Sequence, residues 1–396
     1  MKPLVRDMVR TGVSVTAVTG LALLPAYLLR NTVRNVVQGQ TSEAPAPTSD
    51  NLDIVSLDEG WNSIGVAIND RGEVTGTAMK DNESIRAFVV RGKKATLLPL
   101  PKGAPLSAAS DINEEGIVAG NAGSEEAVRG VLWRGEQSGV LTSGKRDTIV
   151  ATISKDGTAA GLALDPRKDD ATSEWENGFN RLYSSQSFSA GWLDYESFAF
   201  QKVAWSGMHF SSSNFAGMVW KRPGEGKSIG EFIPQSGNAE GSLVGVTIQK
   251  DEPVPAFFKA GKISSLPKPE GAGIALPFSV NSSEVAVGAA ASGGKILPVG
   301  WSKGKTGFLP VPGGRQGLAF GINNEKMAVG VIEAEDGMAH AAVWKEGKVA
   351  DLNDFIDKDS GWTLVQARDV NNKGQIVGTA VKGERFATFV ISLRKR

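Results

Sequence analysis

Residues 351–393 decide the fold, and they read DLNDFIDKDSGWTLVQARDVNNKGQIVGTAVKGERFATFVISL. An extended run, Trp362–Val370, leads into the polar turn Asn371–Gly374, and a short apolar strand, Gln375–Gly378, leaves it. After a second polar turn comes an aromatic-rich strand, Phe386–Ile391. Asn and Gly tolerate the positive φ of tight turns, and short β-branched or aromatic runs favour strands. The stretch therefore predicts antiparallel strands joined by hairpin turns.

The same unit recurs along the chain. Its signature is a turn Asn, a Gly three residues later and a second Gly four residues after that, and such self-similarity indicates a repeat architecture. The complete copies are Asn69/Gly72/Gly76, Asn113/Gly116/Gly120, Asn238/Gly241/Gly245 and Asn371/Gly374/Gly378. Three further copies each lose one member: Ser154/Gly157/Gly161, Asn281/Glu284/Gly288 and Asn323/Lys326/Gly330.

An aromatic strand follows the last Gly of each copy, after 13 or 14 residues in most of them. We expect it to end at Val90, Trp133, Trp175, Phe258, Trp301, Trp344 and near Phe389. Trp220 is left over by this count, and counting back 13 residues from it reaches Gly207. We therefore expect a degenerate eighth copy at residues 200–220, with Phe200 in the Asn position.

Each unit holds about four short strands in roughly 43 residues, which is the size of a propeller blade. The last copy stops at Leu393 without its fourth strand, and a spare strand of that type, Leu52–Leu57, precedes the first copy. Pairing the two closes a ring and removes exposed sheet edges, which favours a propeller over an open solenoid. The sequence predicts an all-β fold, an eight-bladed β-propeller over residues 52–393, with seven blades as the alternative. Residues 165–235 form an irregular, aromatic-rich sector of it.

Three short motifs carry a resemblance to a known family. Asp351-Leu352-Asn353, Ser360-Gly361-Trp362 and Asn371–Gly378 followed by an aromatic strand resemble the bacterial HAF-repeat proteins. The resemblance is strong over the final unit and recurs over roughly residues 60–165 and 235–393. It implies a β-propeller outside the cytoplasm, and it carries no catalytic motif.

The amino terminus has three parts. Residues 1–10 are basic, and residues 11–30 hold an uncharged run that ends at Arg30. As a helix this run is about 28 Å long, close to the thickness of a bilayer's hydrocarbon core. We expect a single transmembrane helix in the lipid bilayer, with a cleaved signal peptide or a peripheral amphipathic helix as alternatives. Residues 31–51 form a flexible tether.

The distribution of charge bears on location and partners. Basic residues ahead of the uncharged run slightly outweigh those behind it, which favours a propeller on the periplasmic, extracytoplasmic face of a bacterial membrane. Overall, 43 basic residues balance 43 acidic ones. A balanced charge suggests no polyanionic partner, so we expect no binding of nucleic acid.

Candidate sites for chemistry are few. The chain has no cysteine, which excludes disulfides, thiolate metal sites and a cysteine nucleophile. The two histidines, His209 and His340, lack the spacing of a metal site. Residues 165–170 read as a solvated loop, and Asp357–Gly361 offers alternate oxygen ligands without the distal Glu of a calcium loop. With no nucleophile elbow or phosphate loop, we expect no enzyme, no metal and no cofactor.

Aromatic residues concentrate between Trp175 and Trp220. Aromatic side chains with a polar tip suit binding surfaces, although part of this group could fill the core between blades, as we expect of Trp133, Trp301 and Trp344. The candidates for partner binding are Trp175, Tyr183, Phe188, Trp192, Tyr195 and Phe210.

These features favour a non-catalytic, membrane-anchored β-propeller that acts as an accessory or scaffold subunit of an integral membrane protein complex. One alternative is an extracytoplasmic module that binds carbohydrate or a surface through stacked aromatic rings. The other is a hydrolase or lyase whose acidic residues converge on the central channel.

Overall fold

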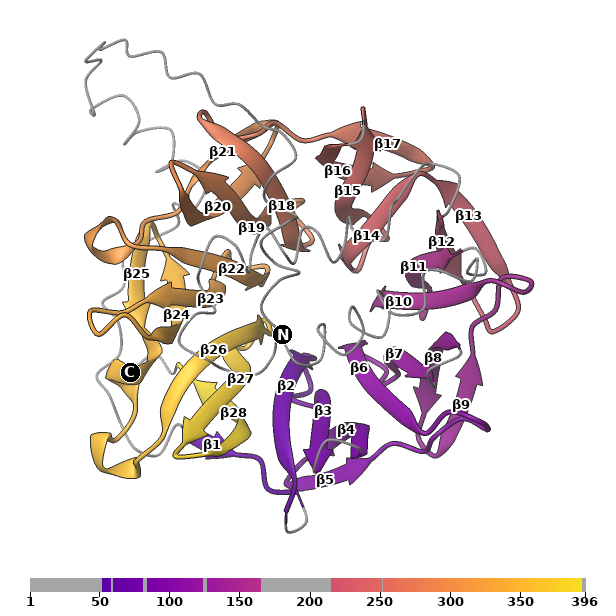
Figure 1. Ribbon diagram of the computed structural model, residues 1–396, viewed down its shortest axis with the longest axis horizontal. Helices are drawn as coiled ribbons and strands as arrows, with labels where there is room; N and C mark the ends of the chain where they lie inside the picture. Colours follow the sequence, from indigo (N-terminus) through magenta and orange to yellow (C-terminus); the bar gives the residue numbers. More distant parts are fainter. Residues whose placement is uncertain are drawn as a thin grey trace, which may run out of the picture.

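The computed structural model describes residues 52–57, 60–80, 84–123, 127–164, 215–250 and 252–393. They form seven four-stranded antiparallel sheets around a common axis (Figure 1). The chain is therefore a seven-bladed β-propeller. The predicted all-β propeller is confirmed and the seven-blade alternative is right, whereas the count of eight blades is wrong.

In each blade the first strand lies nearest the axis and the following strands lie progressively farther out (Figure 1). The first four blades are β2 (Asn62–Ile68), β3 (Val74–Lys80), β4 (Ser84–Arg91), β5 (Lys94–Leu97); β6 (Leu106–Ile112), β7 (Val118–Gly123), β8 (Val128–Arg134), β9 (Gln137–Val140); β10 (Asp147–Ile153), β11 (Ala159–Leu164), β12 (Phe215–Trp220), β13 (Gly226–Gly230); and β14 (Phe232–Gly237), β15 (Leu243–Gln249), β16 (Glu252–Lys259), β17 (Lys262–Ser265). The last three are β18 (Ala272–Val280), β19 (Ala286–Ser292), β20 (Lys295–Ser302), β21 (Lys305–Phe308); β22 (Gly317–Ile322), β23 (Ala328–Glu333), β24 (Ala339–Lys345), β25 (Lys348–Asp351); and β26 (Thr363–Val370), β27 (Gln375–Lys382), β28 (Arg385–Ser392) with β1 (Leu52–Ile54). The short 3-10 helices are η2 (Pro312–Gly314), η3 (Leu352–Phe355) and η4 (Lys358–Ser360).

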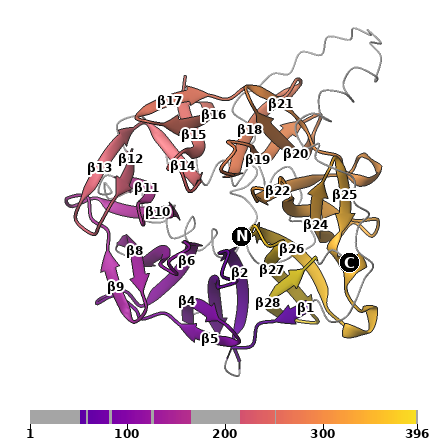
Figure 2. The same cartoon turned by 180° about the vertical axis from the view of Figure 1, so that it is seen from behind.

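The two ends of the chain close the ring, as the sequence predicts. Strand β1 pairs antiparallel with β28, and Ile54 lies opposite Phe389 (Figure 2). The seventh blade thus takes its outermost strand from residues 52–54, which cover part of the edge that β28 would otherwise leave unpaired. The strand is shorter than expected, since it ends at Ile54 rather than Leu57.

The expected eighth copy at residues 200–220 is wrong. Trp220 ends β12, the third strand of blade 3, and lies opposite Ala159 in β11. Its place is that of Trp133, Trp301 and Trp344, each of which is buried and donates its indole N–H to a proline carbonyl 34 residues earlier. Trp220 makes the matching bond, at 3.0 Å, to the carbonyl of Thr142, 78 residues earlier.

From the acceptor carbonyl to the Trp, blade 3 therefore spans 44 more residues than those three blades, and the connection between β11 and β12 accounts for the difference. The predicted number of blades was wrong because the aromatic residues of the insertion have the same spacing as those of a repeat unit. Trp175, which that spacing assigned to the end of the strand, lies outside the described residues. The run at residues 11–30, which we expect to span a membrane, also lies outside the described residues. Among the described residues, no helix has the length and apolar character needed to cross a bilayer.

The Asn that starts each turn connects neighbouring blades. Its Oδ1 accepts backbone N–H groups of its own turn, as Asn281 does from Ser283 and Val285 at 3.0 and 2.9 Å. Its Nδ2 donates to the backbone carbonyl of the equivalent turn residue in the next blade. The six links, at 2.9 to 3.1 Å, run from Asn69 to Asn113, Asn113 to Ser154, Asn238 to Asn281, Asn281 to Asn323, Asn323 to Asn371 and Asn371 to Asn69.

This network corrects the expected role of Asn in the turn. Positive φ falls not on the Asn but on the residue three places later, such as Gly72 at +79°. Glu284 and Lys326 take that conformation at +57° where the Gly is lost. Asparagine suits this position because one buried side-chain amide can form hydrogen bonds to its own turn and to the next blade at once.

The seventh link is missing, between blades 3 and 4. Ser154 has no amide, and its hydroxyl bonds within its own turn, to Asp156 Oδ1 at 2.5 Å and the Thr158 carbonyl at 3.0 Å. The joint is held instead by Thr152, whose Oγ1 accepts the N–H of Gly237 at 3.1 Å. Among the described residues the asparagine ring is thus open only beside the blade that carries the insertion.

The last Gly of the signature lies opposite the innermost strand of its own blade. A Cβ added at any of the seven positions would be 1.9 to 2.1 Å from a backbone carbonyl oxygen of that strand. Real Cβ atoms do not approach an oxygen so closely, so only Gly fits. This explains why the last Gly is present in all seven copies, whereas the middle one is replaced twice.

Replacing Asn281 by Ala should lower the free energy of unfolding by about 2–4 kcal/mol, because it removes three hydrogen bonds and leaves the buried Asn323 carbonyl with only the bond from the Lys326 N–H. Urea denaturation followed by circular dichroism measures the change. Ser154→Ala is the matched control, since it sits at the same turn position without an interblade amide, and it should cost about half as much. Equal losses in the two variants would show that the interblade bond contributes nothing.

Replacing Gly330 by Ala should destabilise the fold by about 3 kcal/mol, because the new methyl group would meet the Leu318 carbonyl and force the two strands apart. Gly273→Ala is the control: Gly273 also lies in a strand, is exposed and has open space around its Cβ position, so its change should stay within about 0.5 kcal/mol. Thermal unfolding of both variants tests the close-approach explanation, which fails if Gly330→Ala unfolds like the wild type.

Candidate functional site

A β-bulge interrupts the innermost strand of every blade, three residues before the turn residue. The bulge leaves one residue per blade unpaired, and bulges commonly re-aim a side chain in this way. Because the innermost strands surround the axis (Figure 1), these half-buried residues form a ring around it. In blade order they are Val66, Ser110, Ala151, Gln235, Phe278, Phe320 and Arg368.

The two halves of this ring differ in size and chemistry. Blades 1 to 3 contribute small side chains, and blades 4 to 7 contribute large ones. The ring centroids of Phe278 and Phe320 are 5.7 Å apart, and the Cζ atom of Arg368 lies 4.5 Å from the centroid of Phe320. Phe278, Phe320 and Arg368 therefore stack in sequence around one side of the axis, and we call them the axial wall.

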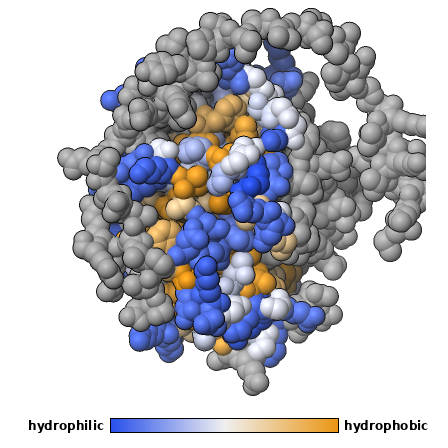
Figure 3. All heavy atoms as spheres, turned by 90° about the vertical axis from the view of Figure 1, so that its left-hand side faces the viewer, coloured by the Kyte–Doolittle hydropathy of each residue, from blue (hydrophilic) through white to orange (hydrophobic). Residues whose placement is uncertain are grey.

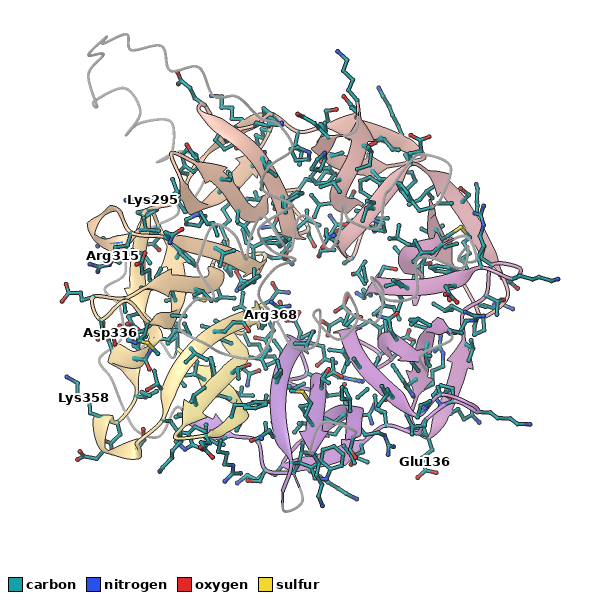
Figure 4. All side chains as sticks on the ribbon, in the orientation of Figure 1. Glu136, Lys295, Arg315, Asp336, Lys358 and Arg368 are labelled. Atoms are coloured by element: carbon teal, nitrogen blue, oxygen red, sulfur yellow. The ribbon has the colours of Figure 1, made fainter. Side chains whose placement is uncertain are left out.

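Arg368 brings a positive charge to the axis. In Figure 4 it is labelled at the inner end of β26, whereas other labelled charged residues, such as Glu136 and Lys358, lie at the outer edge. Burial lowers the pKa of Arg368 to about 10, against the opposing effect of the Asp369 charge, so the side chain stays protonated at neutral pH. Within the described part of the chain it makes no hydrogen bond or ion pair.

Two buried carboxylates lie next to bulge residues, and both hold blades together. Asp369 Oδ2 accepts the N–H of Ile68 in blade 1 at 2.9 Å. Asp111 Oδ2 accepts the N–H of Ile153 at 2.9 Å and the hydroxyl of Thr152 at 2.7 Å, both in blade 3. Burial raises the pKa of Asp369, and burial together with the Asp369 charge raises that of Asp111 to about 6. Neither group is free to act as an acid or base without releasing a blade joint.

His340 is held in a second polar pair, in blade 6. Its Nδ1 lies 2.5 Å from Asp351 Oδ2, and Asp351 also accepts the N–H of Asn353 at 2.8 Å at the start of η3. The hydrogen bond to Asp351 raises the pKa of His340, against a smaller effect of burial. The pKa of Asp351 is lowered: burial would raise it, but the bonds from His340 and Asn353 outweigh burial. This pair fixes the outer strand and the 3-10 turn after it.

The sequence-predicted site residues are otherwise not brought together by the described structure. Asp357 caps η4 by accepting the N–H of Asp359 at 2.9 Å. Within the described ranges no cluster of three or more His, Asp or Glu residues is placed to hold a metal ion. His209, residues 165–170 and the six aromatic candidates lie outside those ranges: Trp175, Tyr183, Phe188, Trp192, Tyr195 and Phe210.

Sequence reasoning missed the axial wall. Its members are 42 and 48 residues apart and come from three different blades, so no local motif marks them. One signal was available: aligned on the turn residue, the column three positions earlier changes from Val, Ser and Ala to Gln, Phe, Phe and Arg. This position matters because the bulge leaves its residue unpaired on the innermost strand, next to the axis.

Neither protein-family models nor curated protein sequences match this chain. Solved structures do. An oligogalacturonate lyase in complex with manganese is 10% identical, with a TM-score of 0.57 over 90% of this chain and 96% of its own. The β-propeller domain of the Trilobed protease from Pyrococcus furiosus is 8% identical, with a TM-score of 0.50 over 86% and 97%. YCF48 bound to D1 peptide is 9% identical, with a TM-score of 0.50 over 89% and 98%. Identities this low show the propeller fold alone.

The His340–Asp351 pair predicts a pH dependence of stability. The folded pKa of His340 lies above its unfolded value, so the stabilisation is fully present below about pH 6.5 and is lost as the pH rises through the folded pKa. Urea unfolding from about pH 6 to about pH 9 should therefore show a decline that His340→Gln lacks. The charges facing the imidazole are Asp336, Asp351 and Asp354.

Asp111 gives the internal comparison for this test. Its raised pKa also removes stability as the pH rises, but between its unfolded value of about 3.9 and its folded value of about 6, below the His340 window. The difference between wild type and His340→Gln above about pH 6.5 thus isolates the imidazole. Parallel profiles for the two proteins in that range would contradict the assignment.

Proposed function

We propose that this chain is a non-catalytic β-propeller that serves as a scaffold or accessory subunit of an integral membrane protein complex. Residues 11–30 hold it at the bilayer, and the propeller lies on the extracytoplasmic face. The observation that carries the proposal is the insertion in blade 3, which adds 44 residues relative to blades 2, 5 and 6. This insertion contains all six partner-binding candidates.

The insertion is placed so that it can serve a partner without disturbing the ring. It leaves β11 at Leu164 and returns to β12 at Phe215, and these two residues lie opposite each other in the ladder. The sheet is thus complete without the inserted residues. A long insertion in a surface connection is the usual way in which a rigid scaffold acquires a binding function.

The rest of the described surface offers little for an apolar contact. The side shown in Figure 3 mixes hydrophilic and hydrophobic residues instead of presenting one apolar face. Met338, 43% exposed, is the single large hydrophobic side chain that stands out among the described residues. Large exposed apolar patches mark partner surfaces. The aromatic residues of the insertion are therefore the better candidates for a partner contact.

The polar chemistry of the described residues supports a non-catalytic role. Asp111 and Asp369 are both committed to blade joints, and His340 is committed to Asp351. Among the similar structures, YCF48 is a propeller described as bound to D1 peptide. The comparison supports the idea that this fold can present a surface to a polypeptide.

One observation favours the hydrolase or lyase alternative. An acid with a pKa of about 6, such as Asp111, can exchange protons near neutral pH, and one structurally similar propeller is an oligogalacturonate lyase. Both Asp111 oxygens, however, already accept hydrogen bonds: Oδ1 from the N–H of Ile112 at 2.7 Å, and Oδ2 from Thr152 and Ile153. We therefore keep the non-catalytic function as the main proposal.

Excision of residues 165–214 tests the scaffold function. Joining Leu164 to Phe215 through Asn-Gly creates a two-residue hairpin in register with the existing ladder. The excised protein should unfold in a single cooperative transition near the wild-type temperature, because blade 3 stays complete. It should lose the integral membrane proteins that co-purify with the intact chain in mild detergent.

Two variants of the full chain complete this test. Changing the six aromatic candidates to Ser, with the insertion kept, should also abolish co-purification. Trp362→Ser removes a half-buried aromatic side chain of blade 7 and should leave co-purification unchanged. Purification of the intact, detergent-solubilised chain as a free monomer would end the proposal, and so would an excised protein that keeps its partners.

A further inference from the structure

Among the described residues Arg368 makes no hydrogen bond or ion pair, although the charge of Asp369 is near it. Asp369 follows it in the chain, but the Asp369 oxygens accept the N–H groups of Ile68 and Val370, at 2.9 and 2.8 Å. A half-buried guanidinium loses hydration, and that loss is normally offset by hydrogen bonds to its five N–H donors. Stacking on Phe320 covers one face of the group and provides no acceptor for the N–H edge.

The neighbours of Arg368 in the axial wall are apolar and flat. Phe278 and Phe320 pack against a cluster of buried residues between blades 5 and 6 that includes Leu318 and Ile296. Both rings are nevertheless only half-buried. The wall thus combines a planar cation with adjoining aromatic surface, and a ligand that uses both must carry an anionic group next to an apolar, planar one.

The opposite half of the bulge ring carries small, uncharged side chains. Val66, Ser110 and Ala151 are much smaller than the residues facing them, and none is charged. Ser110 Oγ donates to the Val150 carbonyl at 3.0 Å and accepts from Asn121 at 3.2 Å, so its polar atom is already used. Asp111, the carboxylate next to Ser110, directs its Oδ2 into the joint with blade 3, and its Oδ1 accepts the N–H of Ile112.

We propose that the axial wall binds the carboxylate group of an aromatic organic acid. The guanidinium fork of Arg368 receives the two carboxylate oxygens, since this geometry matches a carboxylate in a bidentate pair. The aromatic part of the ligand lies against Phe278 and Phe320. This binding does not depend on the proposed membrane partner, because the two contacts use different parts of the molecule.

Isothermal titration calorimetry of the full detergent-solubilised chain tests the proposal with benzoate and with benzamide, its neutral counterpart. Benzoate should bind saturably, and benzamide should show no binding at the same concentrations. Arg368→Gln should weaken benzoate binding about tenfold or more, because it removes the charge and the fork. Arg368→Lys keeps the charge without the fork, so its affinity should fall between those of the wild type and Arg368→Gln.

Arg385→Gln is the matched control. Arg385 lies in the same blade and is also stacked on an aromatic ring, with its Cζ atom 5.8 Å from the centroid of Trp362, and its replacement should leave benzoate affinity unchanged. N-acetylphenylalanine and benzoate together identify the source of the acid: tighter binding of the former indicates the carboxyl end of a polypeptide, and tighter binding of the latter indicates a free aromatic acid.

Three results would overturn the proposal. They are the absence of saturable benzoate binding, equal binding of benzamide, and unchanged affinity in Arg368→Gln. Galacturonate, an acid without an aromatic part, should bind more weakly than benzoate, and equal binding would contradict the role given to the two phenylalanines. Thermal unfolding shows whether Arg368→Gln is folded; if it is not, the comparison of benzoate with benzamide on the wild-type chain decides.

Discussion

The ring depends on one buried hydrogen bond that is made six times, from an asparagine side-chain amide to the backbone carbonyl of the equivalent residue in the next blade. A single small sheet is only marginally stable, so each blade needs its neighbours. Packing of apolar side chains between blades supplies most of the free energy but is not directional. The amide bond adds direction, because it forms only when two turns lie side by side in one relative position. The same bond joins Asn371 to Asn69, so that residues 302 positions apart meet as consecutive blades do.

The repeat signature reflects three different physical demands. The asparagine is needed for its two-sided hydrogen bonding, and where Ser154 replaces it the interblade link is absent and Thr152 takes over part of the joint. The middle glycine only eases a positive φ, so Glu284 and Lys326 can stand in for it at a modest cost in free energy. The last glycine admits no side chain, because a backbone carbonyl lies about 2 Å from where its Cβ would be. How strictly each position is kept follows the severity of its constraint.

Much of this fold could be predicted from local patterns, and the failures have identifiable causes. Turn residues and short apolar runs predicted the strands, and the spare strand at Leu52 predicted the closure with Phe389. The blade count failed because residues inserted into blade 3 imitate a unit, and only the pairing of Trp220 with Ala159 reveals the insertion. The axial wall could not be predicted, since the bulge that places Arg368 beside Phe320 depends on strand register and on the closed ring. The six aromatic candidates remain a prediction from composition.

The molecule thus combines a regular scaffold with two irregular features, an insertion beside the one open joint and a charged residue at the axis. Both are recognised as departures from the repeated structure of the blades, and the asparagine ring holds those blades in place. Hydrogen exchange of the asparagine side-chain amides, followed by nuclear magnetic resonance, tests that ring most directly. The Nδ2 protons of the six linking asparagines should exchange together and only through global unfolding. Independent exchange at the rates of exposed side-chain amides would contradict the account.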